Sequence, residues 1–244
     1  MSYRWPGIRD GPWLPRRKGA SAVRFPPRLA APLLLLAVAA CSTVSTQEHM
    51  LEHFERSDEV QRAIIRGDLE AARAPARWLA EHEHMDLPPS SVVPLEGFRS
   101  AARDVAEAPD LEAAAMAAAW AHRACGACHE ALGAPRFMVG DAPPERRDMA
   151  SHTSRHWWAV DRMRTGLSGP SEESWQAGVS ALIDTSLDVW IQEASLSGVE
   201  RARELAGRVH DIAQQVNLAR DWDTRTEAFG RLLASCAHCH SERP

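Results

Sequence analysis

The sequence predicts an all-α protein, and three observations support this fold class. Long stretches of the 244-residue chain are rich in Ala, Leu, Glu and Arg, which favour helices. Alternating Val, Ile and Thr patterns of the kind that strands show are few. A cysteine motif and several landmark residues occur twice, in the same order, along the chain. We therefore expect two tandem four-helix bundles, each with the motif near the end of its last helix.

Residues 1–41 are predicted to be a leader that contains a signal peptide and a lipobox cysteine. The apolar run at residues 29–40 is about 12 residues long, which suits a signal peptide and is too short to span a bilayer. The run ends at Cys41, in a context similar to the bacterial lipobox, where the leader is cleaved and the cysteine receives lipid. The alternative is an ordinary secretory signal with a chance cysteine. We expect a lipoprotein on the periplasmic side of a bacterial membrane, and Ser42 favours the outer membrane.

The predicted mature chain, from Cys41 onward, is acidic. It contains 21 basic and 32 acidic residues, a net charge of −11, and no lysine. An acidic body without a basic cluster argues against nucleic-acid binding. It favours association with protein partners that present basic docking surfaces. Residues 42–47 are expected to be a tether between the lipid anchor and the first helix.

The first bundle is predicted to occupy residues 48–132. Its four helices are expected at residues 48–66, 68–83, 95–108 and 110–131. Gly67 is expected to end the first helix, and Pro88-Pro89 to break the chain after the second. Pro75 should kink the second helix or end it early. Asp110 is expected to cap the fourth helix, which carries the motif.

The second bundle is predicted to occupy residues 148–244. Residues 133–147 hold glycines and prolines in a proportion typical of a linker. The four helices of the second bundle are expected at residues 148–165, 171–190, 197–219 and 221–240. Ser171 should begin the second of these helices, and Asp221 should cap the fourth.

The repeat is found by sliding the chain against itself. At an offset of 99 residues His53 pairs with His152, and Gly67 pairs with Gly166. Trp78 pairs with Trp175 at an offset of 97, and Cys125 pairs with Cys236 at an offset of 111. These offsets imply roughly 14 extra residues between the second and third helices of the second half. Sequence identity along the alignment is low, so the evidence for the repeat is a few matching residues that occur in the same order.

Every cysteine in the chain has an expected role. Besides Cys41, the other four lie in Cys125-Gly-Ala-Cys128-His129 and Cys236-Ala-His-Cys239-His240. C-x-x-C-H is the signature of c-type haem attachment. Two thiols one helical turn apart can both add to the vinyl groups of one porphyrin, and the histidine that follows can ligate the iron. We therefore expect two covalently bound haems, with His129 and His240 as proximal ligands.

Two other interpretations of the cysteines stay open at this point. The four thiols of the motifs could form two C-x-x-C disulfides in an oxidising compartment, or they could bind one zinc ion together. Neither alternative requires the histidine that directly follows each motif, and neither explains the repeat.

Each half resembles the cytochrome c-prime family, on the evidence of its helix count and the position of its C-x-x-C-H. The resemblance implies an exported four-helix bundle with the motif near the C-terminal end of the last helix. It also implies that the first helix supplies the group on the far side of the haem. In that family an apolar residue there leaves the iron open to gases, and a methionine closes it. The tandem fusion and the lipid anchor depart from the family.

The first helix of each half offers two donors one turn apart. These are Met50 with His53, and Met149 with His152. Residues at i and i+3 share a helix face, so either member could reach the iron. We favour His53 and His152 as distal ligands, with the methionines or an open site as alternatives and His156 as runner-up in the second half. The remaining histidines outside the motifs, His49, His82, His84, His122 and His210, are expected to be solvated.

These features predict a membrane-tethered di-haem c-type cytochrome for single-electron transfer, an electron carrier rather than an enzyme. Histidine in place of methionine at the sixth position predicts a low potential. The alternative is a haem-based sensor or enzyme that binds nitric oxide, carbon monoxide or peroxide at an open iron. A third possibility is a redox subunit of a larger respiratory complex.

Overall fold

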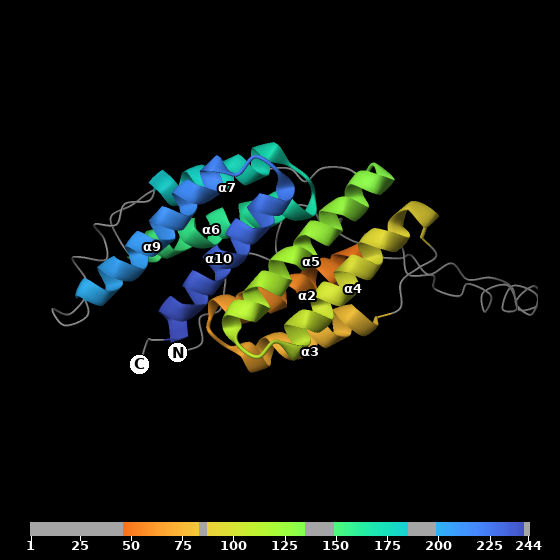
Figure 1. The fold of residues 1–244 in the computed structure, drawn as a ribbon, viewed down its shortest axis with the longest axis horizontal. Coiled ribbons are helices and arrows are strands. Elements are labelled where there is room, and N and C mark those ends of the chain that lie inside the picture. The colour runs from red at the N-terminus through yellow and green to blue at the C-terminus, as the bar shows by residue number, and fades with distance from the viewer. Residues whose placement is uncertain (1–45, 83–86, 135–148, 185–198, 242–244) are drawn as a thin grey trace, which may run out of the picture. The chain divides into compact units, whose positions relative to one another are not determined.

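The computed structural model describes residues 46–82, 87–134, 149–184 and 199–241. Within these residues the chain is all-α, as predicted, and contains no strand. The elements in chain order are α2 (Thr46–Ile65), α3 (Leu69–Glu81), the 3-10 helix η1 (Pro89–Ser91), α4 (Val92–Glu107), α5 (Leu111–Leu132), α6 (Met149–Ser168), α7 (Glu172–Asp184), α9 (Val199–Leu218) and α10 (Trp222–Ser241). Figure 1 shows these helices.

The predicted helix boundary at Gly67 is confirmed. Gly67 has a φ of 77°, the left-handed conformation that glycine adopts at little cost. Its N–H donates to the carbonyl of Ile64 at 2.9 Å, and the N–H of Asp68 donates to Ala63 at 3.0 Å. The carboxylate of Asp68 then accepts from the N–H of Ala71 at 2.9 Å and caps α3. A left-handed glycine followed at once by an N-cap gives the sharp α2–α3 turn.

Pro75 does not end its helix early. It lies inside α3, which continues to Glu81. Proline removes one hydrogen bond from the helix ladder, here the one to the carbonyl of Ala71. One side of α3 is buried at Ala72, Ala76 and Leu79, so packing holds the helix together across the missing bond.

The other predicted helix starts are also confirmed. Asp110 accepts from the N–H of Ala113 at 2.8 Å at the start of α5. Asp221 accepts from both the N–H and the hydroxyl of Thr224 at 2.8 Å at the start of α10. The hydroxyl of Ser171 accepts from the N–H of Ser174 at 3.2 Å at the start of α7. Each helix that carries a C-x-x-C-H therefore begins with an aspartate cap.

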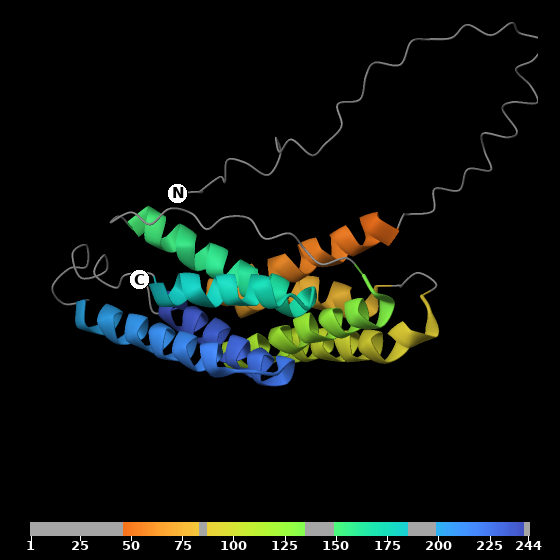
Figure 2. The same cartoon turned by 90° about the horizontal axis from the view of Figure 1, so that it is seen from above.

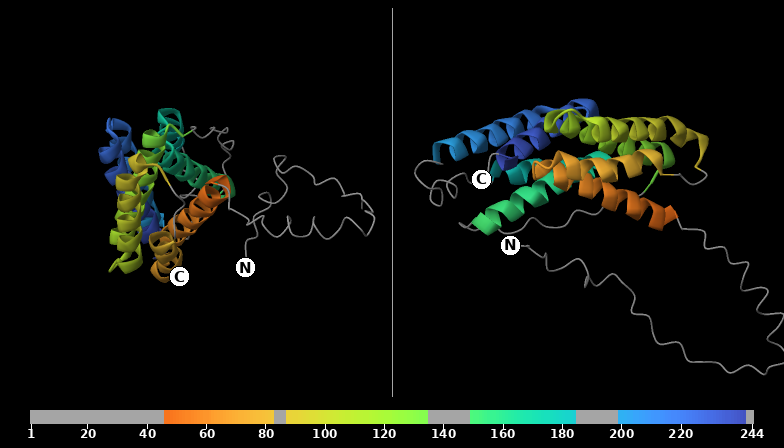
Figure 3. Two further views of the ribbon diagram at one scale, coloured as in Figure 1. Left: turned by 90° about the vertical axis from the view of Figure 1, so that its right-hand side faces the viewer. Right: turned by 90° about the horizontal axis from the view of Figure 1, so that it is seen from below.

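The described helices pack mainly against their neighbours in sequence. In the first half α2 contacts α3, α3 contacts α4, α4 contacts α5, and α2 also contacts α5. In the second half the corresponding contacts join α6 to α7, α7 to α9, α9 to α10, and α6 to α10. All of them lie in one unit, residues 45–244. The views in Figures 2 and 3 show the two sets of helices from other directions.

The two motif helices, α5 and α10, pack against each other as closely as neighbours in sequence do. A Cβ at Gly230 would lie 3.1 Å from the Cα of Met116, and Arg123 pairs with Asp223 at 3.2 Å. Residue numbers rise along α5 while their partners fall along α10, so the pair is antiparallel (Figure 1). Contacts of α5 with α6 and of α10 with α2 accompany this pair. These two contacts are equivalent under the repeat, as in an isologous interface.

The structure corrects the register of the repeat over its first two helices. The N-caps Asp68 and Ser171 are separated by 103 positions, as are the last residues of α2 and α6, Ile65 and Ser168. The predicted pairing of Gly67 with Gly166 is wrong, because Gly166 lies inside α6, where a Cβ would come within 3.0 Å of Trp175. From α4 onward the predicted offset of 111 is retained: Glu107 and Leu218 end equivalent helices.

Several predicted segments lie outside the described residues. They are the leader with Cys41, the tether up to residue 45, most of the linker, and residues 185–198 between α7 and α9. The predicted division into residues 48–132 and 148–244 stays a prediction. None of the helices in the described part combines the length and the apolar composition that crossing a membrane requires.

Candidate functional site

The first C-x-x-C-H lies in the last two turns of α5. Behind it the helix is rich in alanine, and Ala114, Ala115, Ala118 and Ala119 are buried. Small residues allow neighbouring helices to approach the motif helix closely. Gly133, with a φ of 61°, ends the helix directly after the motif.

Burial controls the ionisation of the first motif. Cys125 is half-buried, and burial of its thiol, followed by the neighbouring thiol of Cys128, raises its pKa to about 12. Burial also raises the pKa of Cys128 and lowers the pKa of His129. The thiols therefore stay protonated near neutral pH and the imidazole stays neutral. A neutral imidazole has the lone pair that metal ligation requires.

The second C-x-x-C-H occupies the same position in α10. Cys236, Cys239 and His240 lie in its last turns and are half-buried. Burial, followed by the neighbouring thiol of Cys239, raises the pKa of Cys236 to about 12. The inner face of α10 is apolar, with Phe229, Leu232 and Leu233 fully buried. The two motifs thus share a helix position, and in both of them burial raises the pKa of the first cysteine.

The antiparallel packing of α5 and α10 separates the two motifs. Arg123, two residues before the first motif, lies beside Asp223. Cys236 lies thirteen residues further along α10. At about 1.5 Å per residue, this places the motifs roughly 20 Å apart along the helix pair. The four thiols therefore do not meet, which argues against one zinc site built from all of them.

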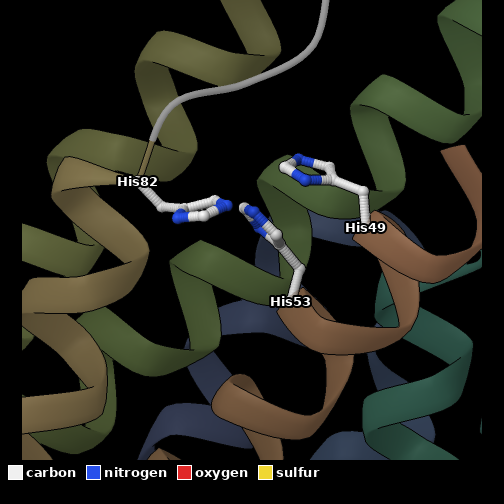
Figure 4. A group of neighbouring side chains, drawn as sticks. All are labelled: His49, His53 and His82. Atoms are coloured by element: carbon white, nitrogen blue, oxygen red, sulfur yellow. The ribbon is translucent and has the colours of Figure 1, made fainter. Parts of the chain in front are cut away.

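Three histidines gather in the first half and form what we call the histidine cluster: His49, His53 and His82. Their nearest ligand nitrogens lie within 4.8 Å of one another. His49 and His53 are one turn apart on α2 and are 5% and 7% exposed, and His82 is the C-cap residue of α3. Figure 4 shows the three imidazoles turned toward one another. Burial lowers the pKa of His49, with the neighbouring His82 as a second cause.

Aromatic side chains line the histidine cluster. Trp78, one turn before His82 on α3, stacks on its ring with centroids 4.0 Å apart. Trp78 also contacts His53 edge-on at 5.3 Å, and the ring of Phe98 from α4 lies 5.8 Å from that of His53. The cluster therefore has an apolar wall on two sides.

The histidine cluster lies at the level of the first motif. Phe98 contacts the ring of His53, and at the adjacent Gly97 a Cβ would lie 3.9 Å from the Cβ of Ala124. Ala124 directly precedes Cys125. Helix α2 also packs against α5. The start of α2, the end of α3 and the start of α4 thus surround the part of the bundle where α5 carries its C-x-x-C-H.

The predicted distal residues have different outcomes. His53 is buried in the cluster, and Met50 is half-buried and is not part of it. His152 and Met149 lie in α6, but their side chains are outside the described part of the structure. His156 is half-buried.

Two members of the histidine cluster, His49 and His82, were expected from the sequence to be solvated. His49 is instead buried, and His82 is half-buried. His122, which lies outside the cluster, was also expected to be solvated and is buried. The spacing of His49 and His53 at i and i+4 was the available signal, since such pairs share a helix face.

The structural register also changes which histidines correspond. At the offset of 103, His49 and His53 fall on His152 and His156. The same offset pairs Asp58 with Asp161 and the fully buried Ile64 with Leu167. The recurring element is therefore a histidine pair at i and i+4, whereas the sequence had suggested a methionine–histidine pair at i and i+3.

A buried arginine connects α2, α5 and α6 beside the first motif. Arg164 is 2% exposed and donates to Asp161 at 2.5 Å, and it lies 3.7 Å from Asp58. Its guanidinium sits over the ring of Phe54 at 4.1 Å. The positive charge of Arg164 partly opposes the rise in the pKa of Cys125. Helix α6 of the second half thus contributes a charge to the surroundings of the first motif.

Comparison with known proteins gives no relative: no protein-family model, curated protein or solved structure matches the chain.

Proposed function

We propose that the chain is a membrane-tethered periplasmic di-haem c-type cytochrome that carries out single-electron transfer. In this proposal residues 48–132 and 148–244 are two tandem four-helix bundles similar to cytochrome c-prime. The observation that carries it is the recurrence of C-x-x-C-H in the last turns of two equivalent, aspartate-capped helices. Each of these helices packs against the first and third helices of its own half: α5 against α2 and α4, and α10 against α6 and α9.

The donor set fits covalently attached haem. Each motif places two thiols one turn apart, so each S–H can add across a vinyl group with a new C–S bond and no leaving group. His129 and His240 follow directly and would be the proximal ligands. Zinc shared by the four thiols is disfavoured, because the motifs lie roughly 20 Å apart along the helix pair.

The distal ligands would come from the first helix of each half. In the first half we assign His53, because it is buried at the level of the motif among aromatic rings. In the second half His152 is the predicted ligand, and the structural register adds His156 as the counterpart of His53. Met50 and Met149 are weaker alternatives, since imidazole is the stronger ligand.

Each haem, when bound, supplies a one-electron iron couple. The residues of the chain would hold that couple in place through thioether bonds at four cysteines and through imidazole ligands, and in the first half Trp78 and Phe98 would add apolar walls. Histidine on both faces predicts a low potential, because methionine in one position raises it. The histidine cluster argues against an open iron in the first half. A gas- or peroxide-binding role would therefore depend on the second half.

The location and partners follow from the sequence. Cys41 would carry lipid and anchor the chain, with the outer membrane favoured by Ser42. The net charge of −11 after the leader would steer the protein toward basic surfaces of redox partners. Nucleic acid is not expected to bind.

Mass spectrometry of the intact, matured protein tests the proposal. The wild-type chain is expected to carry the mass of two haems. The variants Cys125→Ser/Cys128→Ser and Cys236→Ser/Cys239→Ser should each carry one haem, at the remaining motif. A mature protein without added haem mass would overturn the proposal, and so would haem that is lost when the protein is denatured.

A further inference from the structure

The histidine cluster holds more donors than one haem iron uses. With His129 on the proximal side, an iron has room for a single distal imidazole. The cluster supplies three, from α2 and from the end of α3. His49 is nearly as buried as His53.

The geometry of the cluster suits a divalent transition-metal ion. A tetrahedral zinc site holds imidazole nitrogens about 2.0–2.1 Å from the metal, and therefore roughly 3.4 Å from one another. The three ligand atoms already lie within 4.8 Å of one another, so shifts of roughly 1–1.5 Å would bring them to that distance. Zinc-binding histidine pairs at i and i+4 on one helix face, completed by a third residue, are a known arrangement.

The surroundings of the cluster hold its imidazoles in place. Trp78 stacks on His82, and the backbone carbonyl of His82 accepts from Arg99 at 3.1 Å. Both contacts fix the position of the third ligand. Among the described residues the ligand groups of the cluster are imidazoles alone, which separates it from the oxygen-rich sites of Mg²⁺ and Ca²⁺.

We propose that the histidine cluster binds one divalent ion of the zinc class before haem is attached to the first motif. The inference rests on the proposed function in one respect: His53 would serve either the ion or the haem iron, so the two exclude each other. The ion would join α2 to α3 in the haem-free protein and would leave when the haem is inserted.

The test uses the full chain with Cys125→Ser and Cys128→Ser. In this variant the haem at the second motif stays attached, its thiols are consumed in thioethers, and its spectrum reports correct folding. Calorimetry with Zn²⁺, and absorption with Co²⁺ as a spectroscopic substitute, should show one ion per chain with nitrogen ligands. Adding His82→Ala should weaken binding at least about 100-fold, because one of three ligands is lost. His82 is half-buried and ends a helix, so its removal leaves the core intact.

Three controls make the result specific. His210→Ala on the same background, a half-buried histidine of α9 outside the cluster, should leave binding unchanged. His49→Gln should weaken binding as His82→Ala does, and it provides a second variant if the first misfolds. Wild-type protein with both haems attached should bind no ion at this site, because His53 is occupied.

The inference is overturned if the Cys125→Ser/Cys128→Ser chain binds no Zn²⁺ or Co²⁺ while its remaining haem reports a folded protein. Binding that ignores both His82→Ala and His49→Gln would also overturn it. Neither result affects the proposed function, which depends on the count of covalent haems. If the wild-type chain carries no haem, the proposed function fails, and ion binding can then be measured on a chain with all four motif cysteines replaced by serine.

Discussion

The two halves of the protein begin with equivalent helix pairs but surround their motifs with different residues. Helix α2 presents His49 and His53 one turn apart, and α6 carries His152 and His156 at the same positions of the repeat. The candidate distal donors are therefore shared by the two halves. The histidine pair therefore recurs in both halves, although few other residues align between them.

The lining around these donors is not shared. In the first half Trp78 stacks on His82, and Phe98 contacts His53. At the offset of 103 residues Trp78 corresponds to Ala181, which is 4% exposed, and not to Trp175 as the sequence had suggested. At the offset of 111 residues Phe98 corresponds to Val209. The histidine cluster of the first half is therefore flanked by two aromatic rings, whereas the equivalent positions of the second half hold the smaller aliphatic residues Ala181 and Val209. We expect two haems with similar ligands and different surroundings.

The prediction with the largest expected effect tests whether the equivalent histidines of the two halves, His53 and His156, both ligate haem iron. If the repeat sets ligation, His53→Ala and His156→Ala should each convert one of the two haems to a high-spin form. His152→Ala should then leave the spectrum low-spin. Absorption spectra of the reduced variants with and without carbon monoxide measure this directly.

The opposite pattern would break the comparison. Carbon monoxide binding by His152→Ala and none by His156→Ala would show that the halves use different members of their histidine pairs. His53→Ala should also respond less completely than His156→Ala, because His49 and His82 lie beside His53 and either could replace the lost ligand.

The next effect concerns the residue after the first cysteine of each motif, Gly126 in α5 and Ala237 in α10. Haem attachment accepts either residue, but a Cβ at Gly126 would lie 2.1 Å from the carbonyl oxygen of Leu167 in α6. Gly126→Ala should therefore lower the free energy of unfolding by about 1–3 kcal/mol through overpacking. Urea unfolding measures this change.

Gly230→Ala is the matched control, because its nearest neighbour is the flexible end of Met116. It should cost less than Gly126→Ala, and an equal or larger cost would show that the α5–α6 contact is not the tighter one.

A third difference predicts a pH dependence that only one motif helix has. His122 in α5 is buried and accepts or donates a 3.2 Å hydrogen bond with Ser168, and burial lowers its pKa to about 3. The equivalent residue in α10 is the fully buried Leu233. Since the unfolded chain binds a proton near pH 6.5 and the folded chain does not, stability should fall by about 2 kcal/mol between pH 8 and pH 5. His122→Leu should remove this part of the slope in urea unfolding, and an unchanged slope would contradict it.

The smallest expected effect is the loss of a helix cap. Asp110→Ala removes the bond to the N–H of Ala113 and should destabilise the protein by about 1 kcal/mol. Asp104→Ala, an exposed position inside α4, is the control and should have little effect in the same urea titration. The Asp221 cap of α10 makes two hydrogen bonds to Thr224, so Asp221→Ala should lower the free energy of unfolding at least as much as Asp110→Ala. A smaller loss for Asp221→Ala would show that the second bond contributes nothing.

Most of the fold could be predicted from the sequence because its helix boundaries are local. Gly67, Asp110, Ser171 and Asp221 act through hydrogen bonds to residues three or four positions away, and all four predictions are confirmed. Pro75 was expected to kink or end α3, and the helix continues past it. The lateral packing of α5 against α10 could not be read from the sequence, since helix propensity carries no information about partners.

The site was predicted in part. The motif residues are identifiable from spacing alone, whereas the histidine cluster joins residues from two helices. His82 has no local signal that connects it to His53; only the α2–α3 turn brings them together. The register of the repeat was misjudged because Gly67 and Gly166, though alike in sequence, have different roles: one ends a helix and the other lets α6 approach Trp175.

The most direct test of the central claim is an absorption spectrum of the matured wild-type protein, oxidised and reduced, with and without carbon monoxide. We predict two covalent c-type haems with sharp low-spin bands that do not change when the gas is added. A protein without c-type bands would contradict the claim that the chain is a cytochrome. A high-spin spectrum that shifts for both haems would contradict histidine ligation, and the gas-binding function would replace electron transfer.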